Sequence, residues 1–145
     1  MAEPPEFFID RSLGRRIVPE ALRACGLVVH TMAEVYGERV GQGLRDEVWL
    51  RDVGERGWVV LMKDVAIRRR PVEREALITG GVRAFCLTNA QLRGEEQARR
   101  LVANRHRILR QTAQPGPYIY GVYESRILRV WPPWESASAV PRCRG

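Results

Sequence analysis

The chain has 145 residues, of which 45% are hydrophobic and 28% charged, and its 24 basic and 17 acidic side chains give a formal charge of +7. This composition is typical of a folded globular protein and not of a chain that is disordered as a whole. The length suits one domain of about 100–150 residues. No apolar run reaches the ~18 residues of a membrane span, and residues 1–8 lack a basic-then-apolar export signal, so we expect neither a membrane protein nor a secreted one.

The cysteines and histidines are isolated from one another. Cys25, Cys86 and Cys143 are far apart and form no CxxC pair, and His30 and His106 have no second ligand close by. The sequence therefore offers no structural zinc site. We expect a reducing cytoplasm, with Cys25 and Cys86 as small apolar residues of the core.

Arginine supplies almost all of the positive charge. Lys63 is the only lysine, so 23 of the 24 basic residues are arginines. Arginine makes planar, bidentate contacts with phosphates, which favours a nucleic-acid partner, and the codon usage of a GC-rich genome is the alternative origin of the excess. The net charge favours a polyanionic partner over an acidic membrane surface, because no basic amphipathic helix stands alone.

Short strands and helices are predicted to alternate in the first half of the chain. Three apolar runs predict strands, at residues 7–9, 27–30 and 58–62. Helical spacing predicts helices at about 18–26 and 46–53, the second with its N-cap near Arg45 or Asp46. The glycines between residues 31 and 44 predict a loop, with room for one helical turn around Glu34.

The second half continues the alternation. Helices are predicted from Pro71 to about Thr79 and from Gly94 to about Thr112, the longest of the chain, with a strand at 82–87 between them. Residues 118–123 and 126–131 predict a closing hairpin. The pattern predicts an α/β fold, a single three-layer domain over residues 1–131 with a mostly parallel central sheet, followed by a flexible tail at 132–145.

The chain contains only four aspartates, Asp10, Asp46, Asp52 and Asp64. Asp10 and Asp64 directly follow apolar strands, and the carboxyl ends of parallel strands form the ligand-binding edge of an open sheet. Carboxylates at that edge repel each other unless a cation lies between them, and hard divalent cations such as Mg²⁺ and Mn²⁺ prefer oxygen ligands. Asp46, at a predicted helix start, is the third candidate ligand.

Each aspartate also has a plain structural interpretation. An aspartate at a helix start or after a strand is often only an N-cap or a turn residue, which alone would explain Asp46 or Asp64. Asp52, inside a predicted helix, is interpreted as a solvated surface residue. The sequence contains no GxxxxGK[ST] loop and no GxGxxG loop, which argues against a nucleotide-binding site.

Three segments carry a family resemblance. The sequence FFIDRSLG at 7–14 resembles the opening of PIN-like nucleases, in which a strand ends in a metal-binding aspartate. The segment DEVW at 46–49 and the strand end VVLMKD at 59–64 resemble the next two motifs of that family, in the same order and spacing. The resemblance covers roughly residues 7–110 and is greatest for the small toxin-type branch.

The chain departs from the family pattern at two positions. Met62 stands where the family often has Thr or Ser, and Arg11 follows the first aspartate where related branches carry Glu. Each departure removes a polar group that could lie near the metal. The fourth acidic position of fuller sites stays open between Glu47, Glu34 and the amide of Asn89, in that order of preference.

The resemblance implies a metal-dependent endoribonuclease in which Asp10, Asp46 and Asp64 hold Mg²⁺ or Mn²⁺ and Glu47 orients a water molecule. Lys63 and six arginines are candidates for contacts with RNA phosphates, a solvated surface being the alternative: Arg11, Arg15, Arg16, Arg68, Arg69 and Arg70. The resemblance also implies a protein antitoxin encoded nearby, and a homodimer is equally plausible.

Two further functions are considered beside the nuclease. Arg11 and Met62 weaken the predicted acidic site, which favours a catalytically inactive PIN-like module that binds nucleic acid or protein. A receiver-like phospho-acceptor domain also carries acidic residues at strand ends. Such a domain needs an acidic pair on its first strand and a lysine late in the chain, and the sequence has neither.

Overall fold

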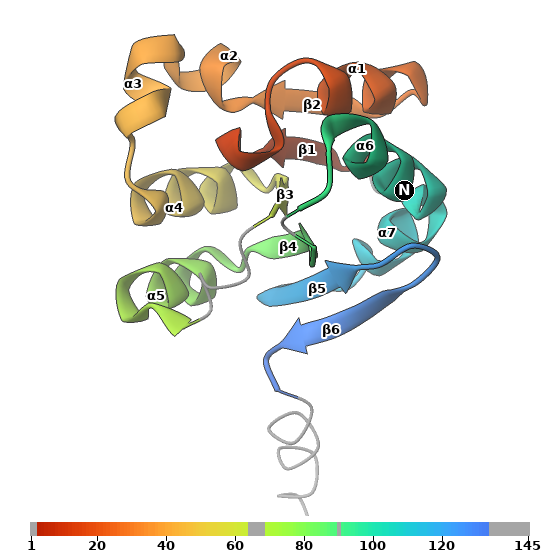
Figure 1. Ribbon diagram of the computed structural model, residues 1–145. Coiled ribbons are helices and arrows are strands. Elements are labelled where there is room, and N and C mark those ends of the chain that lie inside the picture. Colours follow the sequence, from red (N-terminus) through yellow and green to blue (C-terminus); the bar gives the residue numbers. More distant parts are fainter. Residues whose placement is uncertain (1–2, 64–68, 90, 134–145) are drawn as a thin grey trace, which may run out of the picture.

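A six-stranded sheet with the order β2-β1-β3-β4-β5-β6 forms the centre of the computed structural model, which describes residues 3–63, 69–89 and 91–133 (Figure 1). Strands β1 to β5 are parallel, and β6 pairs antiparallel with β5. The strands are β1 Glu6–Ile9, β2 Val28–Thr31, β3 Val59–Met62, β4 Arg83–Leu87, β5 Tyr118–Val122 and β6 Ile127–Trp131. The predicted α/β fold, with its mostly parallel sheet and closing hairpin, is confirmed.

Helices cover both faces of the sheet (Figure 1). One hydrophobic core lies between the sheet and α1, α6 and α7, and the other between the sheet and α2, α4 and α5. The helices are η1 Arg11–Leu13, α1 Ile17–Ala24, α2 Met32–Tyr36, α3 Glu38–Gly43, α4 Asp46–Arg56, α5 Pro71–Gly80, α6 Gly94–Ala103 and α7 Arg105–Gln111.

Successive strand residues alternate between these two cores. Phe7 and Ile9 of β1 pack in the core beneath α1, whereas Phe8 packs beneath α4. All four residues of β3 are buried. A strand that is covered on both faces needs a continuous apolar run rather than an alternating one. This explains the unbroken apolar run at 58–62 of the sequence.

The helical turn predicted around Glu34 is present as α2, but the rest of the predicted loop at 31–44 is wrong, because it forms the second short helix α3. The Thr31 hydroxyl accepts a hydrogen bond from the Glu34 amide at 3.2 Å, and the Glu34 carboxylate accepts one from the Thr31 amide at 3.0 Å. This reciprocal capping box starts α2. Gly41 lies in α3 against Met32, where a Cβ atom would come within 2.8 Å of the Met32 Cγ, so the glycine permits close packing of the two helices.

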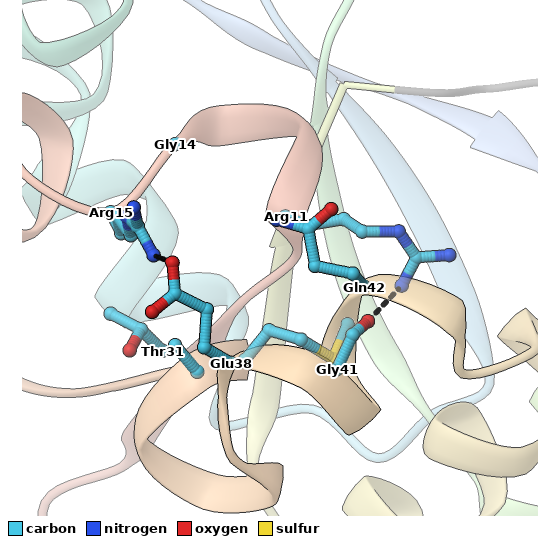
Figure 2. A pocket seen from close by; sticks show the side chains of 9 residues that line it. Arg11, Gly14, Arg15, Thr31, Glu38, Gly41 and Gln42 are labelled. Carbon is cyan, nitrogen blue, oxygen red and sulfur yellow. Dashed lines mark hydrogen bonds and ion pairs between the residues drawn. The ribbon is translucent and has the colours of Figure 1, made fainter.

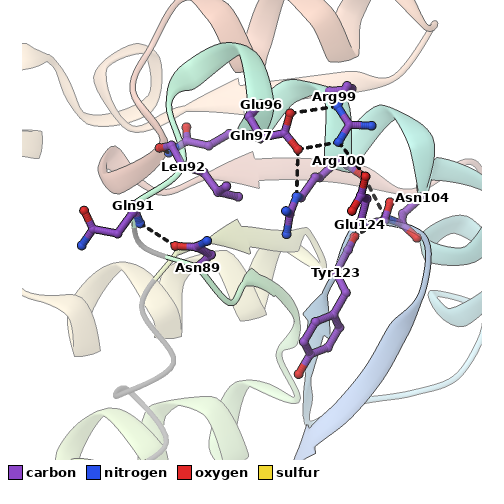
Figure 3. A network of polar contacts seen from close by, with 10 residues as sticks. All are labelled: Asn89, Gln91, Leu92, Glu96, Gln97, Arg99, Arg100, Asn104, Tyr123 and Glu124. Atoms are coloured by element: carbon purple, nitrogen blue, oxygen red, sulfur yellow. Dashed lines mark hydrogen bonds and ion pairs between the residues drawn. The ribbon is translucent and has the colours of Figure 1, made fainter.

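The predicted long helix from Gly94 to Thr112 is also wrong, because Asn104 divides it into α6 and α7. The buried Asn104 amide donates to the carbonyl oxygens of Arg100 at 2.9 Å and Tyr123 at 2.8 Å (Figure 3). Its side chain thus binds the turn after β5 as well as its own helix. A helix that continued straight through this position would lose the second contact.

Two smaller predictions have different outcomes. Cys86 is buried, as predicted, but Cys25 is exposed, so its predicted place in the core is wrong. Cys25 is the C-cap of α1, where the chain turns through Gly26 at the surface. The predicted tail lies outside the described residues except for Pro132 and Pro133, and the domain boundary at 131 stays a prediction. In the described part of the chain, no helix is both long and apolar enough to cross a membrane.

Candidate active site

The candidate site lies at the carboxyl ends of β1 and β3. Strand β1 pairs with β2 on one side and β3 on the other, so the chain leaves β1 and β3 in opposite directions across the sheet. In an open parallel sheet this is the point where the connections leave a crevice for ligands. Asp10 directly follows β1, and its amide donates to the Leu61 carbonyl of β3 at 3.0 Å.

Asp10 is the most buried charged group of this edge, with 8% of its surface exposed. The Ser12 hydroxyl donates to its Oδ2 at 2.8 Å and fixes the orientation of the carboxyl group. Burial raises the pKa of Asp10, and the negative charge of Asp46 raises it further, against the opposing effect of the Ser12 hydrogen bond. The two carboxylates are therefore close enough to act on each other.

Asp46 begins α4 and is held by several donors. The Trp49 indole donates to its Oδ1 at 3.0 Å, and Trp49 itself is fully buried. The Arg11 guanidinium lies 3.4 Å from the same oxygen, and the Arg70 guanidinium lies 3.7 Å from Oδ2. Neighbouring positive charge thus offsets the charge of Asp46, and the rigid indole fixes its position.

Arg11 does more than replace an acidic residue of the family pattern. Its guanidinium donates to the Gly41 carbonyl at 3.1 Å (Figure 2) and to the Leu44 carbonyl at 3.0 Å. It therefore ties η1, directly after Asp10, to the end of α3 and to the segment that leads into Asp46. The arginine that departs from the family pattern thus joins the segments that carry Asp10 and Asp46.

The third predicted ligand, Asp64, lies outside the described residues. Lys63, its neighbour, is half-buried directly after β3, which pairs with β1. Met62 is buried among the side chains beneath α4, so it belongs to the core at the position where the family often has a hydroxyl. Within residues 3–63, 69–89 and 91–133, no three His, Cys, Asp or Glu side chains are grouped closely enough to hold a metal ion.

The candidates for the fourth acidic position lie in different places. Glu47 is in the first turn of α4 beside Asp46, and its carboxylate is 2.9 Å from the Arg45 guanidinium. Glu34 belongs to the capping box of α2 and pairs with Arg23. Asn89 is exposed after β4, and its side-chain oxygen accepts a hydrogen bond from the Gln91 amide at 2.9 Å (Figure 3).

Sequence reasoning missed Glu73, in the first turn of α5. Its carboxylate lies 2.9 Å from the Arg70 guanidinium, and only 14% of the side chain is exposed. Because Arg70 also contacts Asp46, this arginine connects the N-terminal turns of α4 and α5. The available signal was the spacing of Arg70, Pro71 and Glu73, which is typical of a helix start with an acidic first turn.

The remaining predicted phosphate contacts divide into paired and unpaired arginines. Arg15 forms an ion pair with Glu38 (Figure 2). Arg16 and Arg69 are exposed, and neither has a carboxylate partner among the residues that the structure describes. Arg68 lies outside those residues. Of the six arginines predicted to contact phosphate, Arg16 and Arg69 are therefore the described ones whose guanidinium groups are available to an anionic ligand.

The donor chemistry of the site fits a hard divalent cation. Asp10 and Asp46 offer carboxylate oxygens, the ligands that Mg²⁺ and Mn²⁺ prefer. The pKa of Asp10 is raised mainly by burial and further by the negative charge of Asp46, and a divalent cation between the two carboxylates would neutralise their charges. Because Asp10 is buried, water solvates its charge only weakly.

Comparison with known proteins adds two matches. A family model described as a PIN like domain matches residues 5–89 of this chain. The chain is also similar to a curated protein of Mycobacterium tuberculosis (strain ATCC 25618 / H37Rv) named "Putative ribonuclease VapC45". The two are 41% identical over 130 residues, which are 90% of this chain and 94% of that protein. No solved structure matches the chain significantly.

Proposed function

The chain belongs to the PIN-like domain family, and from this premise we propose that it is a metal-dependent endoribonuclease that acts as the toxin of a toxin–antitoxin pair. The observation that carries the proposal is the buried Asp10 carboxylate at the carboxyl end of β1, close enough to Asp46 for the two charges to interact. An aspartate that served only as an N-cap or turn residue would be expected at the surface, because burial of its carboxylate costs free energy.

Asp10 and Asp46, together with Asp64, would hold the Mg²⁺ or Mn²⁺ ion. When bound, such an ion lowers the pKa of a water ligand and neutralises negative charge on the phosphate. The support for Asp64 is its place in the sequence, two residues after β3, since β3 pairs with β1 and both strands end at the same edge. Carboxylates on three separate elements would then meet at one point.

Other residues of the chain keep these carboxylates in place. Ser12 holds Oδ2 of Asp10, and Trp49 holds Oδ1 of Asp46. Such partners restrict the rotation of metal ligands and are themselves important for metal affinity. Arg11 and Arg70, which contact Asp46, are positioned to bind phosphate oxygens once a cation neutralises that carboxylate.

We assign supporting roles to three further residues. Glu47, beside Asp46, can orient water from the first turn of α4, and Asn89 can offer an amide from the end of β4. Lys63 can bind an RNA phosphate next to Asp64. No side chain of the chain has to act as a covalent nucleophile, because water supplies the attacking oxygen in this class of hydrolysis.

The proposal also includes a cellular compartment and protein partners. The related mycobacterial protein is named as a ribonuclease, and the resemblance of the sequence to the toxin-type branch adds an inhibitory protein encoded alongside. The cytoplasm is the site where such a toxin meets its RNA, and the free cysteines Cys25 and Cys86 are compatible with it. Assembly into a homodimer is part of the same proposal.

The test is cleavage of single-stranded RNA in the presence of Mn²⁺ by the wild-type chain and by the variants Asp10→Asn and Asp64→Asn. Loss of a metal ligand should reduce the cleavage rate by at least about 100-fold. Asp52→Asn is the matched control, because Asp52 accepts hydrogen bonds from Tyr36 and Arg56 on the outer part of α4 rather than at the sheet edge. We expect it to cleave like the wild type.

Two results would contradict the proposal. Equal activity of the wild type, Asp10→Asn and Asp64→Asn would indicate a contaminating nuclease. No activity of the wild type with either Mg²⁺ or Mn²⁺ would favour the catalytically inactive module, in which the contacts of Arg11 and Arg70 with Asp46 keep the acidic site closed to metal.

A further inference from the structure

A pocket of about 210 Å³ lies between η1 and the helices α2 and α3 (Figure 2). We call it the α2–α3 pocket. The residues that matter for its chemistry are Arg11, Arg15, Met32, Ala33, Glu38 and Gln42. None of the functions assigned to the acidic site uses Met32, Ala33 or Gln42.

Arg11 connects this pocket to the acidic site. It lines the pocket, and its guanidinium lies 3.4 Å from Oδ1 of Asp46. It also donates to the carbonyl oxygens of Gly41 and Leu44, which holds α3 in place as one wall. A ligand group in the pocket would therefore lie one arginine side chain away from the candidate metal ligands.

The charged side chains of the pocket argue against a phosphate or a metal ion as its ligand. Arg15 is paired with Glu38, and Arg11 donates to the Gly41 carbonyl (Figure 2). Arg11 also donates to the Leu44 carbonyl and contacts Asp46. A phosphate would have to compete with these partners. A metal ion would find Glu38 as the one carboxylate of the lining, and that carboxylate is neutralised by Arg15.

The rest of the lining suits a neutral group with a polar edge. Met32 is buried and Ala33 half-buried, so they offer apolar surface. Gln42 is exposed, and within the described residues its side-chain amide makes no hydrogen bond. Such an amide presents one donor and one acceptor side by side, the pattern by which glutamine reads the edge of a nucleobase.

We propose that the α2–α3 pocket binds one unpaired base of the RNA next to the cleaved phosphate, and that Gln42 determines which base is preferred. This inference rests on the proposed ribonuclease function. The pocket volume is below the roughly 300 Å³ at which drug-sized ligand sites begin, so it suits a single planar base rather than a whole nucleotide. Single-stranded RNA can supply it, because its bases are free to turn out of the stack.

The first test maps cleavage sites in a random-sequence pool of single-stranded RNA with Mn²⁺. The wild type should prefer one base at one position beside the cut. Gln42→Ala should reduce that preference by at least about 5-fold, the lower limit for a bidentate base contact, while it still cleaves RNA with the disfavoured bases at the wild-type rate. Gln114→Ala, an exposed glutamine in the turn after α7, is the matched control and should keep the preference.

The second test measures binding without catalysis. The single variant Asp10→Asn and the double variant Asp10→Asn/Gln42→Ala are titrated, by fluorescence anisotropy, with a short single-stranded RNA that carries the preferred base and with three others that carry each alternative base. The double variant should bind the four RNAs equally, whereas Asp10→Asn should distinguish them by at least about 5-fold. Thermal unfolding of both variants checks that the pocket is intact.

The two tests separate this inference from the proposed function. RNA binding with a base preference that depends on Gln42, without cleavage by the wild type, would support the pocket and refute the nuclease. Metal-dependent cleavage with no base preference, or with a preference that survives Gln42→Ala, would support the nuclease and overturn the pocket. In that case a side chain of a protein partner would be the better candidate occupant. Absence of both binding and cleavage would overturn both.

Discussion

At the scale of single residues, the buried carboxylate of Asp10 costs stability of the folded state and is explained by function. Its carboxyl group is buried and feels the charge of Asp46, and the Ser12 hydroxyl and the neighbouring Arg11 compensate only part of the cost. Burial of a charge that is only partly compensated destabilises the folded state. A protein retains such a group where its charge is used, and a bound divalent cation would use it.

We predict that Asp10→Asn stabilises the chain in the absence of metal. Because the pKa of Asp10 is raised in the folded state, its ionised form opposes folding, and this penalty grows as the pH rises through the raised pKa. The asparagine can still accept the Ser12 hydrogen bond. In EDTA at pH 7, the melting temperature of the variant should rise by about 2–4 °C, equivalent to about 1 kcal/mol.

The same measurement at lower pH supplies the control. At a pH below the unfolded pKa of an aspartate, Asp10 is protonated in both states, and the two chains should melt at the same temperature. Added Mn²⁺ should raise the melting temperature of the wild type and leave that of Asp10→Asn unchanged. A variant that is less stable than the wild type at pH 7 in EDTA would show that the Asp10 charge is already compensated within the fold.

The sequence was informative about the acidic residues but not about their partners. Asp10 could be predicted because it ends an apolar strand, and Asp46 because it begins a helix. The contacts of Asp46 with Arg11 and Arg70 could not, since each joins segments more than twenty residues apart and neither leaves a local pattern. Glu73 left a local pattern, the helix start at Arg70, Pro71 and Glu73, but its link to the site runs through the long-range contact of Arg70 with Asp46.

At the scale of elements, α4 and α5 pack closely on each other at their C-terminal ends. Gly54 and Gly80 form this contact: a Cβ atom on Gly54 would lie 2.8 Å from the Gly80 Cα and carbonyl oxygen. Those are backbone atoms, which cannot rotate away as a side chain can. The two helices therefore approach closely at their C-terminal ends, whereas Arg70 links their N-terminal turns through Asp46 and Glu73.

We predict that Gly54→Ala destabilises the chain by about 1–3 kcal/mol, because the helices must separate to admit the methyl group. Gly43→Ala is the matched control. Gly43 also lies in a helix, but a Cβ atom there would meet nothing within 4 Å, so alanine should be neutral or stabilising by up to about 1 kcal/mol. Chemical denaturation of both variants measures the difference, and equal effects at the two positions would contradict the close helix contact.

The element boundaries that failed did so where local patterns competed with other interactions. Gly37, Gly41 and Gly43 suggested a loop, yet the capping box of Thr31 and Glu34 starts a helix and the close packing of Gly41 on Met32 uses the missing side chain. The break at Asn104 depends on a turn nineteen residues later in the chain, so no local pattern could reveal it.

At the scale of the whole molecule, the alternation of strands and helices predicted a parallel sheet but not the order of its strands. The order matters for function, because the position of β1 between β2 and β3 places Asp10 where the connections of the sheet diverge. The net charge of +7 likewise predicted an anionic partner without a location. The fold adds that Arg11, Arg15 and Arg70 are paired with carboxylates, whereas Arg16 and Arg69 have no carboxylate partner among the described residues.

The central claim is that carboxylates from three elements, Asp10, Asp46 and Asp64, bind one divalent cation together. The most direct measurement is a Mn²⁺ titration of the purified chain, followed by electron paramagnetic resonance, for the wild type, the three Asp→Asn variants at these positions and the control Asp52→Asn. The claim predicts saturable binding to the wild type and to the control, weakened at least about 10-fold by each of the three site substitutions. Mn²⁺ binding to Asp64→Asn as tight as to the wild type, or no saturable binding to the wild type, would contradict it.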